Sequence, residues 1–289
     1  MGNCFLCHSD KVDLYLEKNG YRFNKCAGCG LVFLENIPKN LVDYYGQGYF
    51  SGDVKLDGYM DYDNEKQISL ETFEKYLNKI EELAGRAGRL LEVGCATGFF
   101  LGLAKARNWE AFGIDVSAYA VEEAKKRNLD AACAVLNDLA PEQHDKIYDV
   151  VAMFDAVEHL NSLEADFEKI KKLLKPGGLL VFATPDAGSW WARLWGRKWH
   201  AFVPPQHINL FSFKNMELFL KQRGFKVVFK GHYGKKFSLP YIFRLLHTWM
   251  GLKFFGALAN FSVNNKLVKA LHLPINLGDT MFVIAKLEN

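Results

Sequence analysis

The segment at residues 89–98 constrains the fold of this chain more than any other. A short apolar run ends in Gly94 and Gly98, and apolar residues then recur at helical spacing through residues 99–107. The two glycines are therefore predicted to lie in a strand-to-helix turn, where backbone can approach a ligand closely. Asp115 ends a second apolar run about 20 residues later, the separation at which a βαβ unit brings a carboxylate to the same crevice to bind a ribose diol.

The glycine pattern differs from the dinucleotide-binding fingerprint. Glu92 precedes the first glycine, and Ala96 stands where the middle glycine would be. An acid is unfavourable beside a diphosphate but suits a cofactor that carries an ammonium group. With these residues the chain resembles the class I S-adenosylmethionine-dependent methyltransferases. The resemblance implies that Glu92 holds the cofactor's amine, that Gly94 and Gly98 approach its methionine moiety, and that Asp115 binds its ribose.

Two further segments extend the resemblance, which covers roughly residues 70 to 235. Residues 148–160 look like the fourth strand and its exit, and residues 173–185 look like the following turn and fifth strand. The fold class implied is α/β, with a Rossmann-like, doubly wound, mostly parallel seven-stranded sheet. The resemblance also assigns three more residues to the cofactor site, namely Val116, Asp138 and Asp155.

Four cysteines near the start of the chain have the spacing of a zinc ribbon. Cys4 and Cys7 form one Cys-x2-Cys pair, Cys26 and Cys29 form another, and eighteen residues separate the pairs. Four thiolates complete a tetrahedral zinc site with no open position, so the metal is expected to be structural. Disulfides are the competing interpretation, and an expected reducing cytosol disfavours them. The spacing also differs from that of iron–sulfur sites.

The ribbon refines the resemblance. Together with the following tyrosine-rich segment, it looks like the N-terminal module of zinc-ribbon methyltransferases, which include enzymes that methylate nucleotide-linked deoxysugars. In those relatives this segment folds over the cofactor pocket, which implies that Tyr45 or Tyr49 closes the site here. Packing of both tyrosines in a core is the alternative.

Three parts are predicted along the chain. Residues 1–35 form the ribbon, and residues 36–88 form a linker and an N-terminal helix over the cofactor site. Residues 89–289 form the methyltransferase domain, with a helical insertion at about 239–273 before the last strand. The insertion is rich in Phe, Leu, Trp and Met. It is predicted to be either a cap docked over the substrate cleft or an interfacial helix that contacts a membrane or a lipid carrier.

Positive charge is concentrated in one part of the chain. Residues 186–260 hold twelve Lys and Arg against two acids, whereas acids exceed bases in the remainder. This favours an anionic or carrier-linked acceptor, or peripheral membrane contact through residues 239–260, with solvated surface lysines as the alternative. No signal peptide and no membrane-spanning run are recognisable, so a cytoplasmic location is expected, with membrane association as an open alternative.

Histidines after the predicted strands are the candidate bases. Open α/β sheets bind ligands at the carboxyl ends of their strands, and His159 and His207 both follow such ends. His207 begins a His-x-x-x-Phe-Ser pattern that related methyltransferases carry on the acceptor side. It is therefore the predicted base, against a capping or core role, and His159 is predicted as pocket wall beside the cofactor.

A tryptophan stripe beyond the fifth predicted strand has two interpretations. Trp191, Trp195 and Trp199 repeat every four residues, with Arg193 and Arg197 on another face of the same helix. The stripe is predicted either to pack in a core or to form an aromatic wall for a sugar or base ring, flanked by phosphate-binding arginines.

The leading hypothesis is methyl transfer from S-adenosylmethionine to an oxygen or carbon of a small molecule, such as a sugar or metabolite on a phosphate-bearing or lipid carrier. The chain lacks the Asn/Asp-Pro-Pro-aromatic sequence expected of nucleic-acid amino methylation. The alternative is an RNA-binding or RNA-directed protein that uses the ribbon and the basic segment. The basic and acidic residues of the ribbon offset one another, which argues against nucleic acid.

Overall fold

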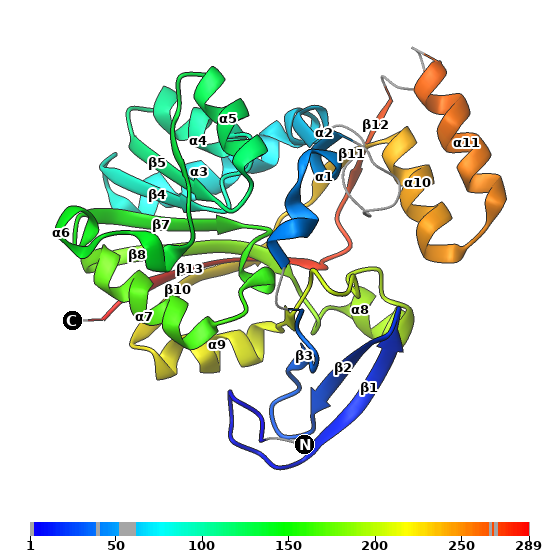
Figure 1. Cartoon of the computed structure of the whole chain (residues 1–289), viewed down its shortest axis with the longest axis horizontal. Coiled ribbons are helices and arrows are strands. Elements are labelled where there is room, and N and C mark those ends of the chain that lie inside the picture. Colours follow the sequence, from blue (N-terminus) through cyan, green and yellow to red (C-terminus); the bar gives the residue numbers. More distant parts are fainter. Residues whose placement is uncertain (1–2, 39–40, 52–61, 266–267, 269–270, 289) are drawn as a thin grey trace.

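The computed structural model describes residues 3–38, 41–51, 62–265, 268 and 271–288 (Figure 1). Its centre is a seven-stranded sheet of strand order β10-β13-β8-β7-β4-β5-β6. The five strands from β8 to β6 run parallel, and β13 and β10 pair antiparallel at one edge. The strands are β4 (Arg89–Val93), β5 (Glu110–Asp115), β6 (Asp130–Cys133), β7 (Tyr148–Phe154), β8 (Leu174–Pro185), β10 (Phe225–His232) and β13 (Thr280–Leu287). The predicted Rossmann-like, doubly wound fold is confirmed.

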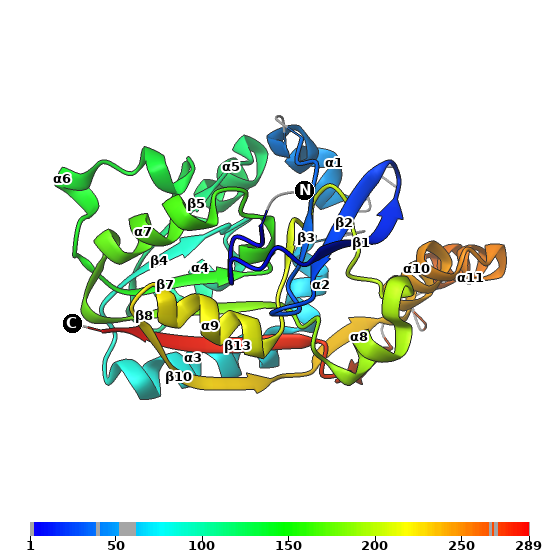
Figure 2. The same cartoon turned by 90° about the horizontal axis from the view of Figure 1, so that it is seen from below.

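Helices cover both faces of this sheet because successive strand residues point to opposite sides. On one face, Val151 and Met153 of β7 pack with Phe167 and Phe219 of the helices α7 and α9 (Figure 2). On the other face, Val150 and Ala152 pack in the cluster that contains helices α3 and α4. The covering helices are α3 (Leu70–Ala84), α4 (Phe99–Ala106), α5 (Ala118–Lys126), α7 (Leu163–Leu173) and α9 (Phe213–Gln222). Burial on both faces explains why the parallel strands are continuously apolar.

Short elements complete the connections. They are α6 (Pro141–His144) and α8 (Trp190–Trp195), with the 3-10 turns η3 (Leu136–Asp138), η4 (Val157–His159) and η5 (Gly196–Lys198). The helix expected before the sheet is divided into α2 (Tyr62–Ile68) and α3. Ser69 lies at the division, and its hydroxyl donates to the carbonyl of Lys236 at 3.0 Å. Thr72 donates to the carbonyl of Gly234 at 2.7 Å, so both hydroxyls attach this junction to the segment after β10.

The N-terminal ribbon shares a sheet with the methyltransferase part of the chain. Strands β1 (Val12–Lys18), β2 (Tyr21–Cys26) and β3 (Val32–Leu34) form an antiparallel sheet whose fourth strand is β9 (Asn209–Leu210). In the register, Val32 pairs with Leu210 and Phe33 pairs with Asn209. The ribbon is therefore joined by backbone hydrogen bonds to a segment far along the sequence.

Side chains reinforce this junction. Phe23 of β2 is fully buried and meets the ring of Phe202 at a centroid distance of 5.1 Å. Trp199 is buried in the same cluster, and Trp191 and Trp195 pack against it. Most of the tryptophan stripe is thus packed between the ribbon and the rest of the chain, as the core interpretation predicts.

The linker passes over the glycine turn. Its described part holds η1 (Leu41–Tyr45) and α1 (Gln47–Ser51), whereas residues 52–61 of the predicted linker lie outside the described residues. Phe50 is buried against Ala96 and Ala120, with Tyr62 and Tyr119 around it. An aromatic group therefore covers the turn between β4 and α4.

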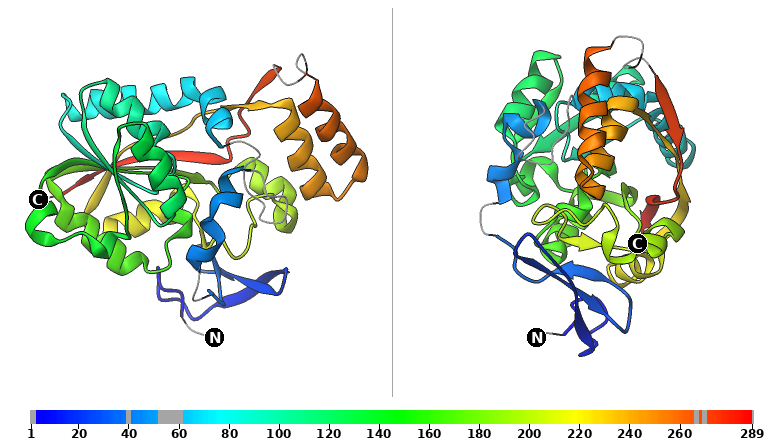
Figure 3. Two further views of the ribbon diagram at one scale, coloured as in Figure 1. Left: turned by 45° about the horizontal axis from the view of Figure 1, so that its top comes forward. Right: turned by 90° about the vertical axis from the view of Figure 1, so that its right-hand side faces the viewer.

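The insertion is a pair of helices on a two-stranded stalk. Helices α10 (Leu239–Met250) and α11 (Lys253–Asn264) pack side by side and stand out from the sheet (Figure 3). Strands β11 (Lys235–Ser238) and β12 (His272–Ile275) pair antiparallel at their base. The ring centroids of Trp249 and Trp195 are 4.2 Å apart, and this contact attaches the hairpin to α8. In the described parts of the chain, no helix has the length and apolarity needed to cross a bilayer.

Candidate functional site

The turn between β4 and α4 adopts a backbone that few residue types allow. Gly94, Ala96 and Gly98 have φ angles of 74°, 46° and 84°, all in the left-handed region. A Cβ on Gly98 would lie 2.5 Å from Cδ1 of Leu129, and a Cβ on Gly94 would lie 3.0 Å from that of Ala156. Glycine is therefore required at Gly98 for helix packing, and at Gly94 for close approach of two strand ends.

Asp115 fixes this turn from the neighbouring strand. Its carboxylate accepts hydrogen bonds from the backbone N–H groups of Ala96 and Ser117, each at 2.8 Å, and from that of Val116. Burial raises the pKa of Asp115, although these three donors act in the opposite direction. Asp115 and Val116 therefore lie at the glycine turn.

Glu92 is a buried acid with an unused oxygen. Its Oε2 accepts no hydrogen bond from any residue that the structure describes. Burial raises the pKa of Glu92 well above its ordinary value, whereas the charge of Lys66 lowers it. A buried carboxylate oxygen without a partner is costly, so a cationic donor in this crevice would stabilise it.

Helix α2 places two residues in the crevice that the sequence did not single out. The ammonium of Lys66 is 3.0 Å from Oδ2 of Asp155 and 5.1 Å from the centre of the Tyr62 ring. Burial raises the pKa of Tyr62, and the charges of Glu92, Asp155 and Asp115 raise it further. In the sequence, a tyrosine and a lysine four residues apart share one helix face. This spacing was the signal that could have identified the two residues as part of the site.

Two further predicted cofactor residues lie in special local geometry. Asp155 follows β7 with a φ of 53°, an uncommon conformation for a residue other than glycine. Asp138 is exposed in η3, where its Oδ2 accepts from the backbone N–H of Val135 at 3.0 Å. The structure thus places Asp155 beside Lys66 in the crevice. The Asp138 carboxylate instead bonds to the backbone of its own 3-10 turn.

The two predicted histidines lie together beside this crevice. The rings of His159 and His207 meet at a centroid distance of 5.0 Å. Nδ1 of His159 is 2.7 Å from the carbonyl oxygen of Gln206, and Nδ1 of His207 is 2.7 Å from that of Ala201. A carbonyl can only accept, so each Nδ1 carries the proton and each Nε2 keeps its lone pair.

Glu158 and Tyr45 complete this group. One potential ligand atom from each of Glu158, His159 and His207 lies within 4.8 Å of the others. Glu158 is buried and accepts a hydrogen bond from Thr184 at 2.9 Å. The hydroxyl of Tyr45 is 3.0 Å from Nδ1 of His159.

Tyr45 links the histidine pair to the cofactor crevice. Burial raises its pKa, and the charges of Glu158 and Asp115 add to the effect. The acid of the glycine turn and the acid beside the histidines therefore both disfavour ionisation of this phenol. Tyr45, one of the two tyrosines predicted to close the site, touches the predicted catalytic residue His159, and its ring lies 5.3 Å from that of Tyr49 between centroids.

Burial keeps both histidines neutral. It lowers the pKa of His207 to about 3, with the charge of His159 as the next cause, and it also lowers the pKa of His159. The charge of Asp155 acts against burial and raises the pKa of both histidines by a smaller amount. Both imidazoles are therefore uncharged lone-pair donors at neutral pH.

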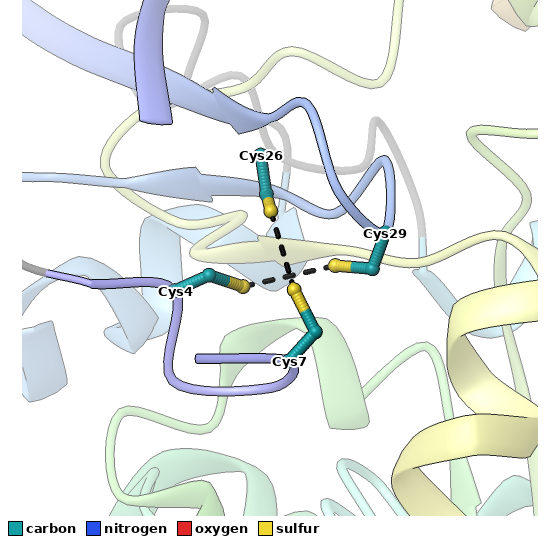
Figure 4. A group of neighbouring side chains, drawn as sticks. All are labelled: Cys4, Cys7, Cys26 and Cys29. Atoms are coloured by element: carbon teal, nitrogen blue, oxygen red, sulfur yellow. Dashed lines mark hydrogen bonds between the residues drawn. The ribbon is translucent and has the colours of Figure 1, made fainter. Parts of the chain in front are cut away.

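The four ribbon cysteines converge on one point (Figure 4). Their sulfurs all lie within 4.8 Å of one another, with 3.7 Å between Cys4 and Cys29 and 3.5 Å between Cys7 and Cys26. The sulfur of Cys26 accepts hydrogen bonds from the backbone N–H groups of Cys29 and Gly28. Burial raises the pKa of Cys26, but these amides and the neighbouring thiols have the larger combined effect and lower it to about 7. This donor set fits a thiophilic metal ion such as Zn²⁺.

Comparison with known proteins agrees with the fold. The "Methyltransferase domain" family matches residues 66–229, more than half of the chain. A ubiquinone biosynthesis O-methyltransferase of Bradyrhizobium sp. (strain ORS 278) is 24% identical over 179 residues, which cover 55% of this chain and 69% of the relative. A malonyl-[acyl-carrier protein] O-methyltransferase of Priestia megaterium is 30% identical over 103 residues, 35% of this chain and 38% of the relative.

Solved structures show the same fold. A SAM-dependent methyltransferase from Archaeoglobus fulgidus superposes with a TM-score of 0.52 at 17% identity, covering 77% of this chain and 97% of that one. A putative sarcosine dimethylglycine methyltransferase from Galdieria sulphuraria gives 0.53 at 14% identity, covering 77% and 88%.

The sheet, the glycine turn and the acid that closes the next strand are those of a class I S-adenosylmethionine-dependent methyltransferase. The chain belongs to the methyltransferase domain family.

The buried histidines make stability depend on pH. The unfolded His207 has an ordinary pKa of about 6.5, whereas the folded value is lower, so the unfolded chain binds more protons below that pH. Stability is therefore lost as pH falls from 7 to 5, by about 2 kcal/mol from His207 alone. Urea unfolding at both pH values measures this loss. His207→Gln should show a smaller loss than the wild type, and His272→Gln, which removes an exposed histidine, should show the full loss; equal losses in both variants would contradict the assignment.

Proposed function

We propose that this enzyme transfers the methyl group of S-adenosylmethionine to an oxygen or carbon of a small anionic or carrier-linked acceptor, such as a sugar or metabolite on a phosphate-bearing or lipid carrier. The observation that carries the proposal is the unused buried oxygen of Glu92 beside the glycine turn, with the neutral His159–His207 pair joined to the same crevice by Tyr45. A cationic methyl donor and a proton acceptor thus have adjacent places.

The residues of the crevice fit the cofactor in charge and chemistry. Glu92 offers a carboxylate to its ammonium group, and Asp115 offers one to the ribose hydroxyls. Lys66 is buried in the same crevice, where its ammonium contacts Asp155. On cofactor binding, this ammonium would contact the cofactor's carboxylate in place of Asp155. Backbone at Gly94 and Gly98 leaves room for close approach. Val116 and Asp138 belong to the proposed contact set of the nucleoside.

The bound cofactor supplies an electrophilic methyl group and a leaving group that departs neutral. The protein must therefore orient the acceptor and receive its proton. We assign the proton to Nε2 of His207, because its Nδ1 is fixed by the carbonyl of Ala201. His159 lines the pocket beside it and orients Tyr45. The positive charge of the cofactor is lost as the imidazole gains one, so the total charge of the site stays constant.

An oxygen acceptor is supported by two relatives whose names describe O-methylation, one in ubiquinone biosynthesis and one on a malonyl-[acyl-carrier protein]. The second name describes an acceptor on a carrier protein. Of the excess Lys and Arg in residues 186–260, Arg193, Arg197 and Lys198 follow the carboxyl end of β8, where an open α/β sheet receives its substrate. A carrier that bears phosphate would be attracted to this segment.

We also propose that Cys4, Cys7, Cys26 and Cys29 hold one structural Zn²⁺. Tetrahedral coordination with Zn–S bonds of about 2.3 Å requires sulfurs about 3.8 Å apart. The closest pairs, at 3.5 and 3.7 Å, are near that separation. Four protein ligands leave no position for water, so the metal would stabilise the ribbon and take no part in methyl transfer.

The cofactor assignment is tested at the two ends of one strand. Asp115→Asn removes the charge proposed to bind the ribose and should weaken S-adenosylmethionine binding by about 1.5–3 kcal/mol. Glu110→Gln, at the start of the same strand β5, should bind as the wild type does. Isothermal titration calorimetry measures both affinities. Unchanged affinity in Asp115→Asn, with an intact fold, would remove Asp115 from the site.

The assignment of the base is tested by kinetics with an identified acceptor, found by incubating methyl-labelled cofactor with cell extract and analysing the products by mass spectrometry. His207→Gln should slow single-turnover methyl transfer by ~10²–10⁴-fold while cofactor affinity stays unchanged. Because the pKa of His207 is lowered to about 3, wild-type kcat/KM should show no ionisation of this residue between about pH 5 and 8. A full chemical rate in the variant would show that another group takes the proton.

The metal is tested by removal. Elemental analysis should find one zinc per chain, and Cys26→Ser should lower this content. Since β3 pairs with β9, chelation should increase hydrogen exchange in residues 208–211 as well as in the ribbon, while β4 and β5 remain protected. Iron in place of zinc, or protection at 208–211 that does not change when the metal is removed, would contradict this assignment.

A further inference from the structure

One lobe of the protein carries no acidic residue. Between Asp186 and Asp279 the sequence contains a single acid, Glu217, which lies on α9 and pairs with Lys230 at 2.9 Å. The helices α8, α10 and α11, with η5 and β12, therefore contain none. We call these five elements the basic lobe; the cations of its described parts are Arg193, Arg197, Lys198, Arg244 and Lys253.

The same lobe exposes large apolar side chains. Phe254 and Phe261 of α11 are 67% and 61% exposed, and Trp190 and Leu194 of α8 are 58% and 66% exposed. The two phenylalanines are seven residues apart, so they lie on one face of the helix. The opposite face of α11 holds the buried Ala259 and packs on α10. Such exposed aromatic side chains mark an interaction surface when they gather on one element.

The lobe projects from the sheet and joins the acceptor side of the site. The α10–α11 hairpin stands away from the body of the protein in Figure 1 and in the left view of Figure 3. Trp249 of the hairpin donates its indole N–H to the carbonyl of Lys198 in η5. The segment after η5 leads directly to His200 and His207. The hairpin is therefore attached to the segment that leads to the proposed base.

We propose that the basic lobe docks on the surface of an anionic lipid bilayer, with Phe254, Phe261 and the exposed α8 residues in the headgroup region and the cations on lipid phosphates. Aromatic and apolar side chains beside Lys and Arg, without acids, are the composition of an interfacial element. Helices of twelve residues are too short to cross a bilayer, so the hairpin lies in the interface.

Charge selects a bilayer over a second copy of this chain. A two-fold dimer through this face would place the same cations opposite one another with no acid to offset them. Anionic lipids offer the complementary charge. The docking does not depend on methyl transfer; that the acceptor is delivered from the membrane rests on the function proposed above.

Vesicle sedimentation tests the docking without any need for activity. The probes are vesicles of phosphatidylcholine alone and of phosphatidylcholine with phosphatidylglycerol in equal parts. The wild type should bind the mixed vesicles at least ~10-fold more strongly, and high salt should weaken that binding. Phe254→Ser with Phe261→Ser should reduce it at least ~10-fold. Arg193→Glu with Lys253→Glu should abolish the preference for the anionic vesicles.

The matched control removes exposed apolar residues elsewhere. Leu14→Ser with Val228→Ser, at sites 40% and 39% exposed on β1 and β10, should bind vesicles as the wild type does. Calorimetric affinity for S-adenosylmethionine confirms that each variant is folded. Wild-type protein that stays in the supernatant, or phenylalanine variants that bind fully, would overturn the proposal. It would also fail if light scattering found a dimer that these variants dissociate. Loss of vesicle binding alone would leave the proposed methyl transfer intact.

Discussion

The backbone pairing of β3 with β9 is the interaction on which the acceptor side of this protein depends. β9 has only two residues and follows His207 after a single position. On one side, the N–H of Leu34 bonds to the carbonyl of Ile208, and on the other, the N–H of Ile208 bonds to the carbonyl of Glu158, both at 2.8 Å. The loop of His207 is thus held between the ribbon and the sheet, which makes the ribbon a structural part of the site.

Electrostatics distinguish the two halves of the crevice. Among the residues that the structure describes, the cofactor side holds the acids Glu92, Asp115 and Asp155 and one buried cation, Lys66, so it favours positive charge. The acceptor side holds two neutral imidazoles beside the buried acid Glu158, and the basic lobe lies beyond it. A cationic donor would therefore be attracted to the acid-rich cofactor side, and an anionic acceptor would be attracted to the cations of the basic lobe. This separation reduces competition between the two ligands for the same groups.

Local patterns in the sequence were sufficient to predict the parallel sheet, the glycine turn and the cluster of four cysteines, because each prediction depends on residue spacing within about 30 residues. The pairing of β3 with β9 could not be predicted, since two residues carry no periodicity and their partner lies far along the chain. Lys66 and Tyr62 were hidden in an ordinary amphipathic pattern. Their importance arises only when tertiary packing turns that helix face toward Glu92 and Asp155.

The division of the ribbon sheet between distant parts of the sequence has a consequence for synthesis. A ribosome delivers β1, β2 and β3 first, but their fourth strand leaves it only after β4 to β8 have been made. Until then β3 has an unpaired edge, which is a template for pairing with other chains. The usual order, in which an N-terminal unit folds to completion first, cannot apply here. The nascent ribbon must remain unfinished, or be protected, while most of the enzyme is still being translated.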